Sequence, residues 1–163
     1  LALGYWRQTK LPVVIGRFFN VVGPRQTGAY GMVLPRFVEA ALAGRPLQVH
    51  DDGAQTRCFA HVDDVVGAVI DLTEHAETAG EIFNIGSDQP ISILELAQEV
   101  IARTKSSGSI EFQSYHEAYD KDFEDIRKRV PDLTKIKRTL NYAPKYTLGE
   151  IIDDVAAQQK STP

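Results

Sequence analysis

The hydrophobic positions along this chain follow two different spacings. Nearly continuous apolar runs at 13–19 and 81–86 are short and rich in β-branched and aromatic residues, which is typical of strands buried on both faces of a parallel sheet. Apolar residues spaced three and four apart predict amphipathic helices elsewhere. These helices are expected at 1–10, 34–44, 62–70, 92–101, 131–140 and 147–155. Strands that alternate with helices place the chain in the α/β class.

Local signals sharpen these boundaries. Ser92 with Glu95, and Thr147 with Glu150, have the spacing of a capping box, which marks the start of a helix. Three further short strands and two loops complete the expected order of elements. The strands are expected at 47–49, 56–60 and 110–113, and the loops at 20–31 and 114–130.

Composition excludes several classes of protein. A chain of 163 residues with 43% hydrophobic and 25% charged residues is typical of a soluble globular domain. Its apolar runs are shorter than the roughly 20 residues of a membrane span, so no membrane association is expected. A net charge of -4 argues against nucleic acid as a partner. The single Cys58, expected to be buried, cannot form an internal disulfide, which favours a reducing, cytoplasmic location.

The sequence shows no pattern typical of a metal site or of a serine nucleophile. The four histidines, at positions 50, 61, 75 and 116, lack the spacing of metal ligands, and no second cysteine joins them. No serine lies in the glycine-flanked turn that exposes a nucleophile. We therefore expect no metal site and no hydrolase triad.

Polar residues at the end of the first strand are the first binding candidates. Arg17 interrupts an apolar strand, so it needs an ionic partner, for which Asp63 or Asp64 is suited, or a position where the strand leaves the sheet. Asn20 follows at the carboxyl end of the same strand. In open α/β sheets this is the end at which ligands bind.

Arginines form the second group of candidates. The guanidinium of Arg57 matches two phosphate oxygens at once, although an exposed arginine on an edge strand is the alternative. Six basic residues lie between 127 and 138, which suits either a polyanion or a solvated helix face. Acidic residues at 117–125 largely cancel this charge. The cancellation makes a nucleic-acid or interaction module using 127–138 the weakest hypothesis.

Two motifs, in this order and at this separation, resemble a known family. They are Arg-Phe-Phe-Asn-Val-Val-Gly-Pro at 17–24 and Gln-Thr-Arg-Cys-Phe-Ala-His-Val-Asp-Asp at 55–64. Both resemble the C-terminal half of extended short-chain dehydrogenase/reductases, the NAD-dependent nucleotide-sugar epimerases and dehydratases. The resemblance covers essentially the whole chain and about half of a complete family member.

The resemblance implies a division of the chain. Residues 1–30 and 60–90 would be the C-terminal strand and helix elements of a Rossmann-type domain. Residues 31–59 and 91–163 would form the smaller α/β lobe that binds the nucleotide-sugar. A complete member is expected to be a homodimer.

The resemblance also assigns substrate-binding residues. Asn20 and Arg57 would bind the substrate diphosphate, and Arg129, or Arg127 beside it, would close over it. The strand Leu47-Gln48-Val49-His50 would line the nucleobase pocket, with its backbone groups reading the edge of a uracil ring. Arg36 and Phe37 are further wall candidates. Relatives commonly carry an aromatic residue followed by glycine where this chain has His50-Asp51.

The catalytic residues of the family are not in this sequence. It has no Gly-x-x-Gly-x-x-Gly fingerprint for a dinucleotide, and neither Tyr5 nor Tyr115 is followed four positions later by lysine. In the family, that tyrosine is the acid/base and the lysine holds the nicotinamide ribose. The chain begins at Leu1 without methionine, so we expect a fragment that is inactive alone, with NAD bound mainly by an upstream half.

The function that the resemblance implies most directly is UDP-hexose 4-epimerisation. A nucleotide-sugar dehydratase or decarboxylase would share this whole half of the protein. Outside enzymes, the alternative is a nucleotide-sugar or phosphate-binding module without catalysis. The residues leave open the sugar, the base and the outcome at C4. Uncovered sheet edges further predict self-association of the isolated chain.

Overall fold

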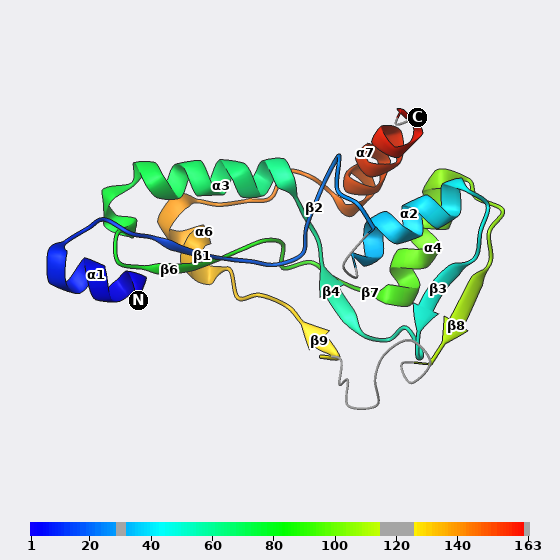
Figure 1. The fold of residues 1–163 in the computed structure, drawn as a ribbon, viewed down its shortest axis with the longest axis horizontal. Helices are drawn as coiled ribbons and strands as arrows, with labels where there is room; N and C mark the ends of the chain where they lie inside the picture. The colour runs from blue at the N-terminus through cyan, green and yellow to red at the C-terminus, as the bar shows by residue number, and fades with distance from the viewer. Residues whose placement is uncertain (29–31, 115–125, 162–163) are drawn as a thin grey trace.

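The computed structural model describes residues 1–28, 32–114 and 126–161, which form an elongated α/β arrangement (Figure 1). The α/β class expected from the hydrophobic pattern is confirmed. The helices are α1 (Ala2–Thr9), α2 (Val33–Leu42), α3 (Val62–Glu74), the 3-10 helix η2 (Ala76–Thr78), α4 (Ile93–Thr104), α6 (Thr134–Leu140) and α7 (Leu148–Ser161). The strands are β1 (Ile15–Phe18), β2 (Val21–Val22), β3 (Leu47–His50), β4 (Thr56–Cys58), β5 (Ala60–His61), β6 (Ile82–Ile85), β7 (Pro90–Ser92), β8 (Ile110–Gln113) and β9 (Lys128–Arg129).

The strands pair in small, mostly parallel sets. β1 pairs with β6, β2 with β5, and β3 with β8, all in parallel. The middle strand of the remaining set is β4, which lies antiparallel to β7 and parallel to β9. In Figure 1, β4 lies between the pair β1–β6 and the pair β3–β8.

Two hydrophobic clusters hold the elements together. In the helical lobe, α2 and α4 pack on β3, and α7 packs on both helices. The fully buried side chains of this cluster include Leu34, Val38, Leu47, Val49, Leu96, Val100, Ile151 and Ile152. In the sheet region, α3 and α6 pack on β6 through Val65, Leu72, Phe83, Ile85, Leu133 and Ile136. The expected division into two domains stays a prediction. α6 packs with the sheet region although it lies in sequence between α4 and α7 of the helical lobe.

Capping fixes the start of two helices in the helical lobe, as predicted. The Glu95 N–H donates to Ser92 Oγ at 3.1 Å, and the Ser92 N–H donates to Glu95 Oε2 at 3.0 Å. The same reciprocal pair joins Thr147 and Glu150 at the start of α7. These bonds satisfy amide groups that the first turn of a helix leaves without partners.

A buried histidine joins the sheet region to the helical lobe. His61 is 2% exposed and its Nδ1 accepts from the Asp63 N–H, which caps α3. Its ring stacks on Tyr146 with centroids 3.9 Å apart, and its Nε2 lies 3.4 Å from Asp154 Oδ2 on α7. The Asp64 carboxylate reinforces this junction by accepting from the backbone N–H groups of Lys145 and Tyr146.

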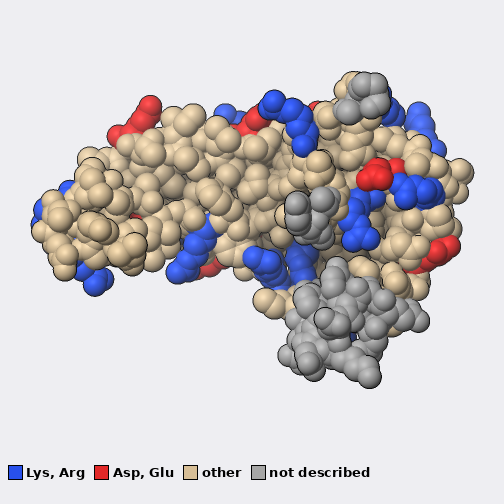
Figure 2. Space-filling view, in the orientation of Figure 1, with Lys and Arg blue, Asp and Glu red and all other residues tan. Residues whose placement is uncertain are grey.

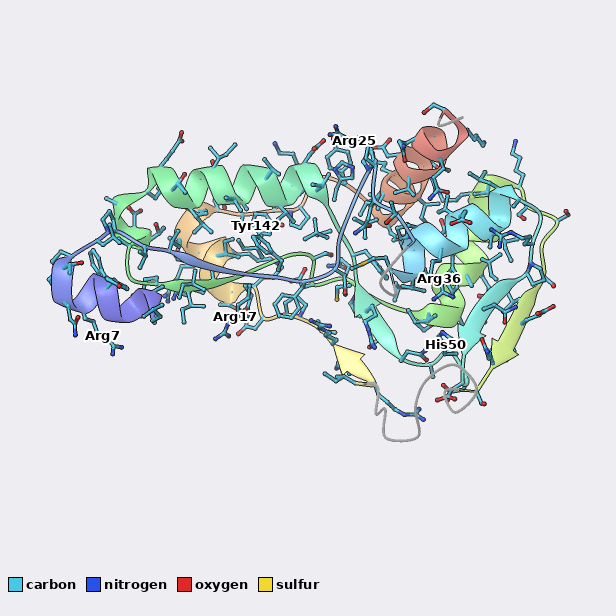
Figure 3. All side chains as sticks on the ribbon, in the orientation of Figure 1. Arg7, Arg17, Arg25, Arg36, His50 and Tyr142 are labelled. Carbon is cyan, nitrogen blue, oxygen red and sulfur yellow. The ribbon has the colours of Figure 1, made fainter. Side chains whose placement is uncertain are left out.

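The expected burial of the first strand is wrong in the structure. Within the described chain β1 has one neighbouring strand, β6, and Phe18 is 54% exposed. Arg17 is exposed and projects from β1 on the side opposite to α3 (Figure 3). No ion pair joins Arg17 to Asp63 or Asp64 among the described residues, because Asp64 binds backbone amides and Asp63 lies beside His61. An apolar run indicates that a strand is suited to burial, but it does not show which strands and helices pack against it.

Three short strands among the described residues were not predicted. β2 lies inside the predicted loop 20–31, β9 inside the predicted loop 114–130, and β7 directly before α4. Each has two or three residues, which is too short for any periodicity to register. Residues 115–125 of the predicted charged loop lie outside the described residues. None of the described helices is long and apolar enough to cross a membrane.

Candidate functional site

The carboxyl end of β1 places Asn20 beside β4. Asn20 has a φ of 40°, in the left-handed region that asparagine tolerates better than most residues. Its Nδ2 donates to Cys58 O at 2.8 Å, and its own carbonyl accepts from the Ala60 N–H at 3.2 Å. These bonds fix the side chain next to Arg57. An amide nitrogen carries two hydrogens, so one bond to Cys58 leaves the group able to donate a second.

Two arginines lie directly opposite each other on neighbouring strands. Arg57 of β4 is the register partner of Arg129 of β9, so both side chains lie on the same face of the sheet. Arg57 Nη1 donates to Thr56 O at 2.9 Å and to Ile126 O at 2.8 Å, which holds the guanidinium against the backbone. Like charges opposite each other in a sheet are destabilising, so an anion between them would be stabilising.

Arg129 also reaches the end of β1. Its guanidinium carbon lies 5.9 Å from the centre of the Phe19 ring, within the range of a cation–π contact. Within the described part of the chain, Arg129 has no carboxylate within salt-bridge distance. Pairwise contacts therefore connect all three segments that carry Asn20, Arg57 and Arg129. Figure 2 shows Lys and Arg side chains gathered on this face where β9 lies in Figure 1.

Arg127 has a different environment. Its Nη1 lies 3.4 Å from Asp52 Oδ2, and 76% of its side chain is exposed. The pKa of Asp52 is lowered chiefly by the hydrogen bond from the Ala54 N–H, and further by Arg127. The paired Arg127 is therefore a weaker anion ligand than Arg129.

Strand β3 buries two of the side chains named for the nucleobase pocket and leaves one backbone edge open. The side chains of Leu47 and Val49 are fully buried in the helical lobe. The backbone N–H groups of Leu47 and Asp51 donate to Ser109 O and Gln113 O, so they point toward β8. Backbone groups alternate between the two edges of a strand. The backbone groups of Gln48 and His50 therefore point to the other edge, which no described strand covers.

A pocket of about 120 Å³ lies beside this open edge of β3. It is lined by Arg36, Phe37, Glu39, Ala40, Arg45, Pro46 and Gln48. Phe37 is 3% exposed and belongs to the core, so it forms the floor of the pocket. Figure 3 shows Arg36 on α2 and His50 at the end of β3. The sequence pointed to the strand Leu47–His50, which includes Gln48, but gave no signal for Arg45.

The turn after β3 explains the unusual His50-Asp51 pair. Asp51 has a φ of 49° and Gly53 a φ of 68°, both in the left-handed region. Glycine is the default residue for this conformation, which accounts for its occurrence in relatives. The backbone carbonyl of His50 accepts from the N–H of Gly53 and from Gln55 Nε2. These bonds hold the turn in place with aspartate at position 51.

Two titratable groups near the site stay protonated at neutral pH. Burial, with the nearby Asp88 charge, raises the pKa of the Cys58 thiol to about 11. Burial also raises the pKa of Tyr142 to about 12, and its hydroxyl donates to Gly86 O at 2.8 Å. Neither group is activated as a nucleophile or base. The described residues also contain no cluster of side chains suited to a metal ion.

Comparison with known proteins identifies the family of this chain. The model of the NAD dependent epimerase/dehydratase family matches residues 1–86. This chain belongs to the NAD-dependent epimerase/dehydratase family, whose cofactor is NAD.

Two decarboxylases are among the relatives that resemble this chain in sequence. A UDP-N-acetyl-alpha-D-glucosaminuronate decarboxylase of Bacillus cytotoxicus is 46% identical over 145 residues, which cover 88% of this chain and 44% of that protein. UDP-glucuronic acid decarboxylase 1 of Arabidopsis thaliana is 36% identical over 150 residues, covering 92% of this chain and 33% of that protein. The chain thus spans less than half the length of these relatives.

Solved structures share the fold. Pal from Bacillus thuringiensis aligns with a TM-score of 0.85 and 34% identity, over 98% of this chain and 49% of that one. The UDP-glucuronic acid 4-epimerase from Bacillus cereus, in complex with UDP-glucuronic acid and NAD, aligns with a TM-score of 0.83 and 26% identity. That alignment covers 96% of this chain and 48% of the epimerase.

Proposed function

We propose that this chain forms the nucleotide-sugar-binding part of an NAD-dependent UDP-uronate decarboxylase. The observation that carries the proposal is the opposed pair Arg57 and Arg129, with Asn20 beside it. Two guanidiniums on one face suit the two adjacent phosphates of a nucleoside diphosphate. The alternative of a non-catalytic module would use the same site.

Decarboxylation is favoured over the C4 inversion that the sequence motifs first suggested. The Bacillus cytotoxicus and Arabidopsis relatives, at 46% and 36% identity, are decarboxylases of UDP-uronates. The epimerase from Bacillus cereus is 26% identical. Both classes act on nucleotide-sugars, so the diphosphate site supports either. The higher identity of the decarboxylases is the reason that we favour decarboxylation.

The proposed role of the arginines is binding and orientation. Each charge-assisted hydrogen bond to a phosphate contributes roughly 1.5–3 kcal/mol. Contacts to the diphosphate, far from the reacting carbon, would fix the position of the sugar. The Arg57 guanidinium is already held by Thr56 O and Ile126 O, so little side-chain freedom is lost when the anion binds.

The residues of this chain do not by themselves fit a complete NAD site. At the carboxyl ends of β1 and β6, Asn20 binds Cys58 O and the Gly86 carbonyl accepts from Tyr142. The sequence also lacks the glycine fingerprint and the Tyr-x-x-x-Lys pair. We therefore derive no step through the cofactor. The expected inactivity of the chain alone stays a prediction.

Calorimetric titration of UDP into the chain tests the proposal. We expect millimolar or tighter binding that Arg129→Ala weakens about tenfold or more, because a charged hydrogen-bond partner is lost. Arg138→Ala, which removes an exposed arginine of α6, is the matched control and should bind UDP like the wild type. The proposal fails if the wild-type chain does not bind UDP, or if both variants bind it equally well.

A further inference from the structure

The strand that carries Arg129 has a short ladder to its neighbour. β9 pairs with β4 through Lys128, opposite Thr56, and Arg129, opposite Arg57. A backbone bond from the Thr56 N–H to Arg127 O, at 2.8 Å, extends this ladder. Arginines directly opposite each other repel, which weakens the pairing. A position of Arg129 that is ready for an anion therefore needs support from outside β4.

The ring of Phe19 gives the first support. Phe19 directly follows β1, and its N–H donates to Ile85 O of β6 at 3.0 Å. A Cβ on Gly86 would lie 3.0 Å from Phe19 Cβ, so the glycine allows Phe19 to pack closely against the end of β6. The ring fixed in this way lies 5.9 Å from the guanidinium carbon of Arg129. At this distance the ring attracts the cation.

The amide of Asn84 gives the second support. Asn84 lies on β6, and its Nδ2 donates to Asp132 O at 3.0 Å. Asp132 follows Arg129 by three positions, and its Oδ1 accepts from the Thr134 N–H at 2.8 Å where α6 begins. Asn84 therefore ties the link between β9 and α6 to the sheet. The segment 129–132 is held by β4 at one end and by β6 at the other.

Helix α6 also docks on β6 through contacts that do not involve Asn84. Lys135 Nζ donates to Glu81 Oε2 at 2.6 Å and to Ile82 O at 2.8 Å. Ile136 is fully buried in the hydrophobic cluster of the sheet region. Because these contacts keep the helix in place, the hydrogen bond from Asn84 is left to fix the segment that precedes it.

We propose that Phe19 and Asn84 are positioning residues that hold Arg129 opposite Arg57 before the diphosphate binds. Phe19 acts on the guanidinium of Arg129, and Asn84 acts on the backbone that follows it. Less freedom is then lost when the anion binds, because the arginine already occupies its place. The proposal rests on the proposed nucleotide-sugar function. It adds the contacts by which the sheet region prepares the diphosphate site.

Double-mutant cycles with Arg129→Ala test this proposal. UDP is titrated into the whole chain, and binding is followed by NMR chemical shifts. Asn84→Ala should weaken UDP binding by about two- to tenfold, the value of one neutral hydrogen bond, and Phe19→Leu by about two- to fivefold. In the Arg129→Ala background neither substitution should weaken binding further, because the residue through which each acts is gone. A merely structural role would give the same loss in both backgrounds.

Two control variants separate positioning from folding. Phe19→Tyr keeps an aromatic ring and should bind UDP like the wild type. Lys135→Met removes a link between α6 and β6 that does not involve Asp132, so it should lower the melting temperature and leave UDP affinity unchanged. If Phe19→Leu fails to fold, Asn84→Ala decides the outcome alone.

The outcomes distinguish this proposal from the proposed function. The positioning role is overturned for Asn84 or Phe19 if its folded variant binds UDP as tightly as the wild type. It is also overturned if the loss is equally large in the Arg129→Ala background. In both cases wild-type binding that Arg129→Ala weakens would leave the proposed function intact. Absence of UDP binding to the wild-type chain would overturn the proposed function and the positioning roles together.

Discussion

The helical lobe and the sheet region differ in how completely each covers its apolar residues. In the helical lobe, α2, α4 and α7 pack against one another over one face of β3, and residues such as Leu96 are completely buried. In the sheet region, Phe18 of β1 is 54% exposed, and Val66 and Ile70 of α3 are each 50% exposed. The difference shows that the described chain has a closed core in the helical lobe and an incompletely covered one in the sheet region.

The proposed site uses both regions. The sheet region contributes Asn20 at the end of β1, and β4 and β9 contribute the opposed arginines. The helical lobe contributes the pocket between α2 and β3. A stable lobe beside an incompletely covered sheet should therefore still bind a nucleotide, provided that β4 keeps its pairing with β9.

A pair of substitutions should separate the two regions most strongly. Leu96→Ala, in the closed core, should lower the free energy of unfolding by about 2–5 kcal/mol, because it removes buried methyl groups and leaves a cavity. Phe18→Ala, on the exposed face of β1, should change it by less than about 0.5–1 kcal/mol. Urea unfolding followed by circular dichroism measures both. Equal losses would contradict the comparison.

Self-association should come from the open region. Exposed apolar side chains of β1 and α3 favour contacts between copies, so we expect sedimentation velocity to show species larger than a monomer. Ile70→Lys should shift this distribution toward the monomer by adding a charge to the apolar face of α3. The control Glu74→Lys, on the same helix, should have less effect. A wild-type chain that is a monomer at all concentrations would be inconsistent with this picture.

A substitution at the junction between the two regions should have a smaller effect on the free energy of unfolding. Asp64 is 9% exposed, and its carboxylate accepts backbone hydrogen bonds from Lys145 and Tyr146. Asp64→Asn replaces one acceptor oxygen with a donor, which should cost about 1–3 kcal/mol of unfolding free energy. Asp63→Asn is the matched control, since the Asp63 side chain is 67% exposed. Chemical denaturation should show a loss in the first variant that clearly exceeds the loss in the second.

Acid should weaken the helical lobe through its capping boxes. Bonds from Ser92 and Thr147 lower the pKa of Glu95 and of Glu150, respectively, below the usual value of 4.5. A lowered folded-state pKa stabilises the protein above the unfolded pKa, and this contribution is lost as the pH falls below about 4.5 through the folded value.

Thermal unfolding between pH 6 and pH 3 tests this expectation. The double variant Glu95→Gln and Glu150→Gln keeps side chains that can cap a helix but cannot titrate. Its melting temperature should therefore fall less steeply with acid than that of the wild type. Identical slopes would show that the two carboxylates do not contribute to the pH dependence.

The sequence was sufficient for features that depend on local chemistry. Capping boxes, helix stripes and the strands at β3 and β8 follow from side chains a few positions apart, and the structure has them where expected. The motifs at 17–24 and 55–64 identified the family for the same reason, because each motif is contiguous. These features require no knowledge of what packs against them.

Features that depend on distant neighbours could not be predicted in the same way. The exposure of Arg17 and Phe18 depends on which elements cover β1. The opposition of Arg57 and Arg129 depends on the pairing of a two-residue strand that has no periodicity. The identity of the open edge of β3 depends on which edge pairs with β8.

The central claim is that Arg57 and Arg129 together hold a nucleotide diphosphate. A crystal structure of this chain with UDP-glucuronic acid tests it most directly. We predict phosphate oxygens within hydrogen-bond distance of both guanidiniums, with the Asn20 amide donating to the same group. A diphosphate that is bound elsewhere, or that contacts neither arginine, would contradict the account.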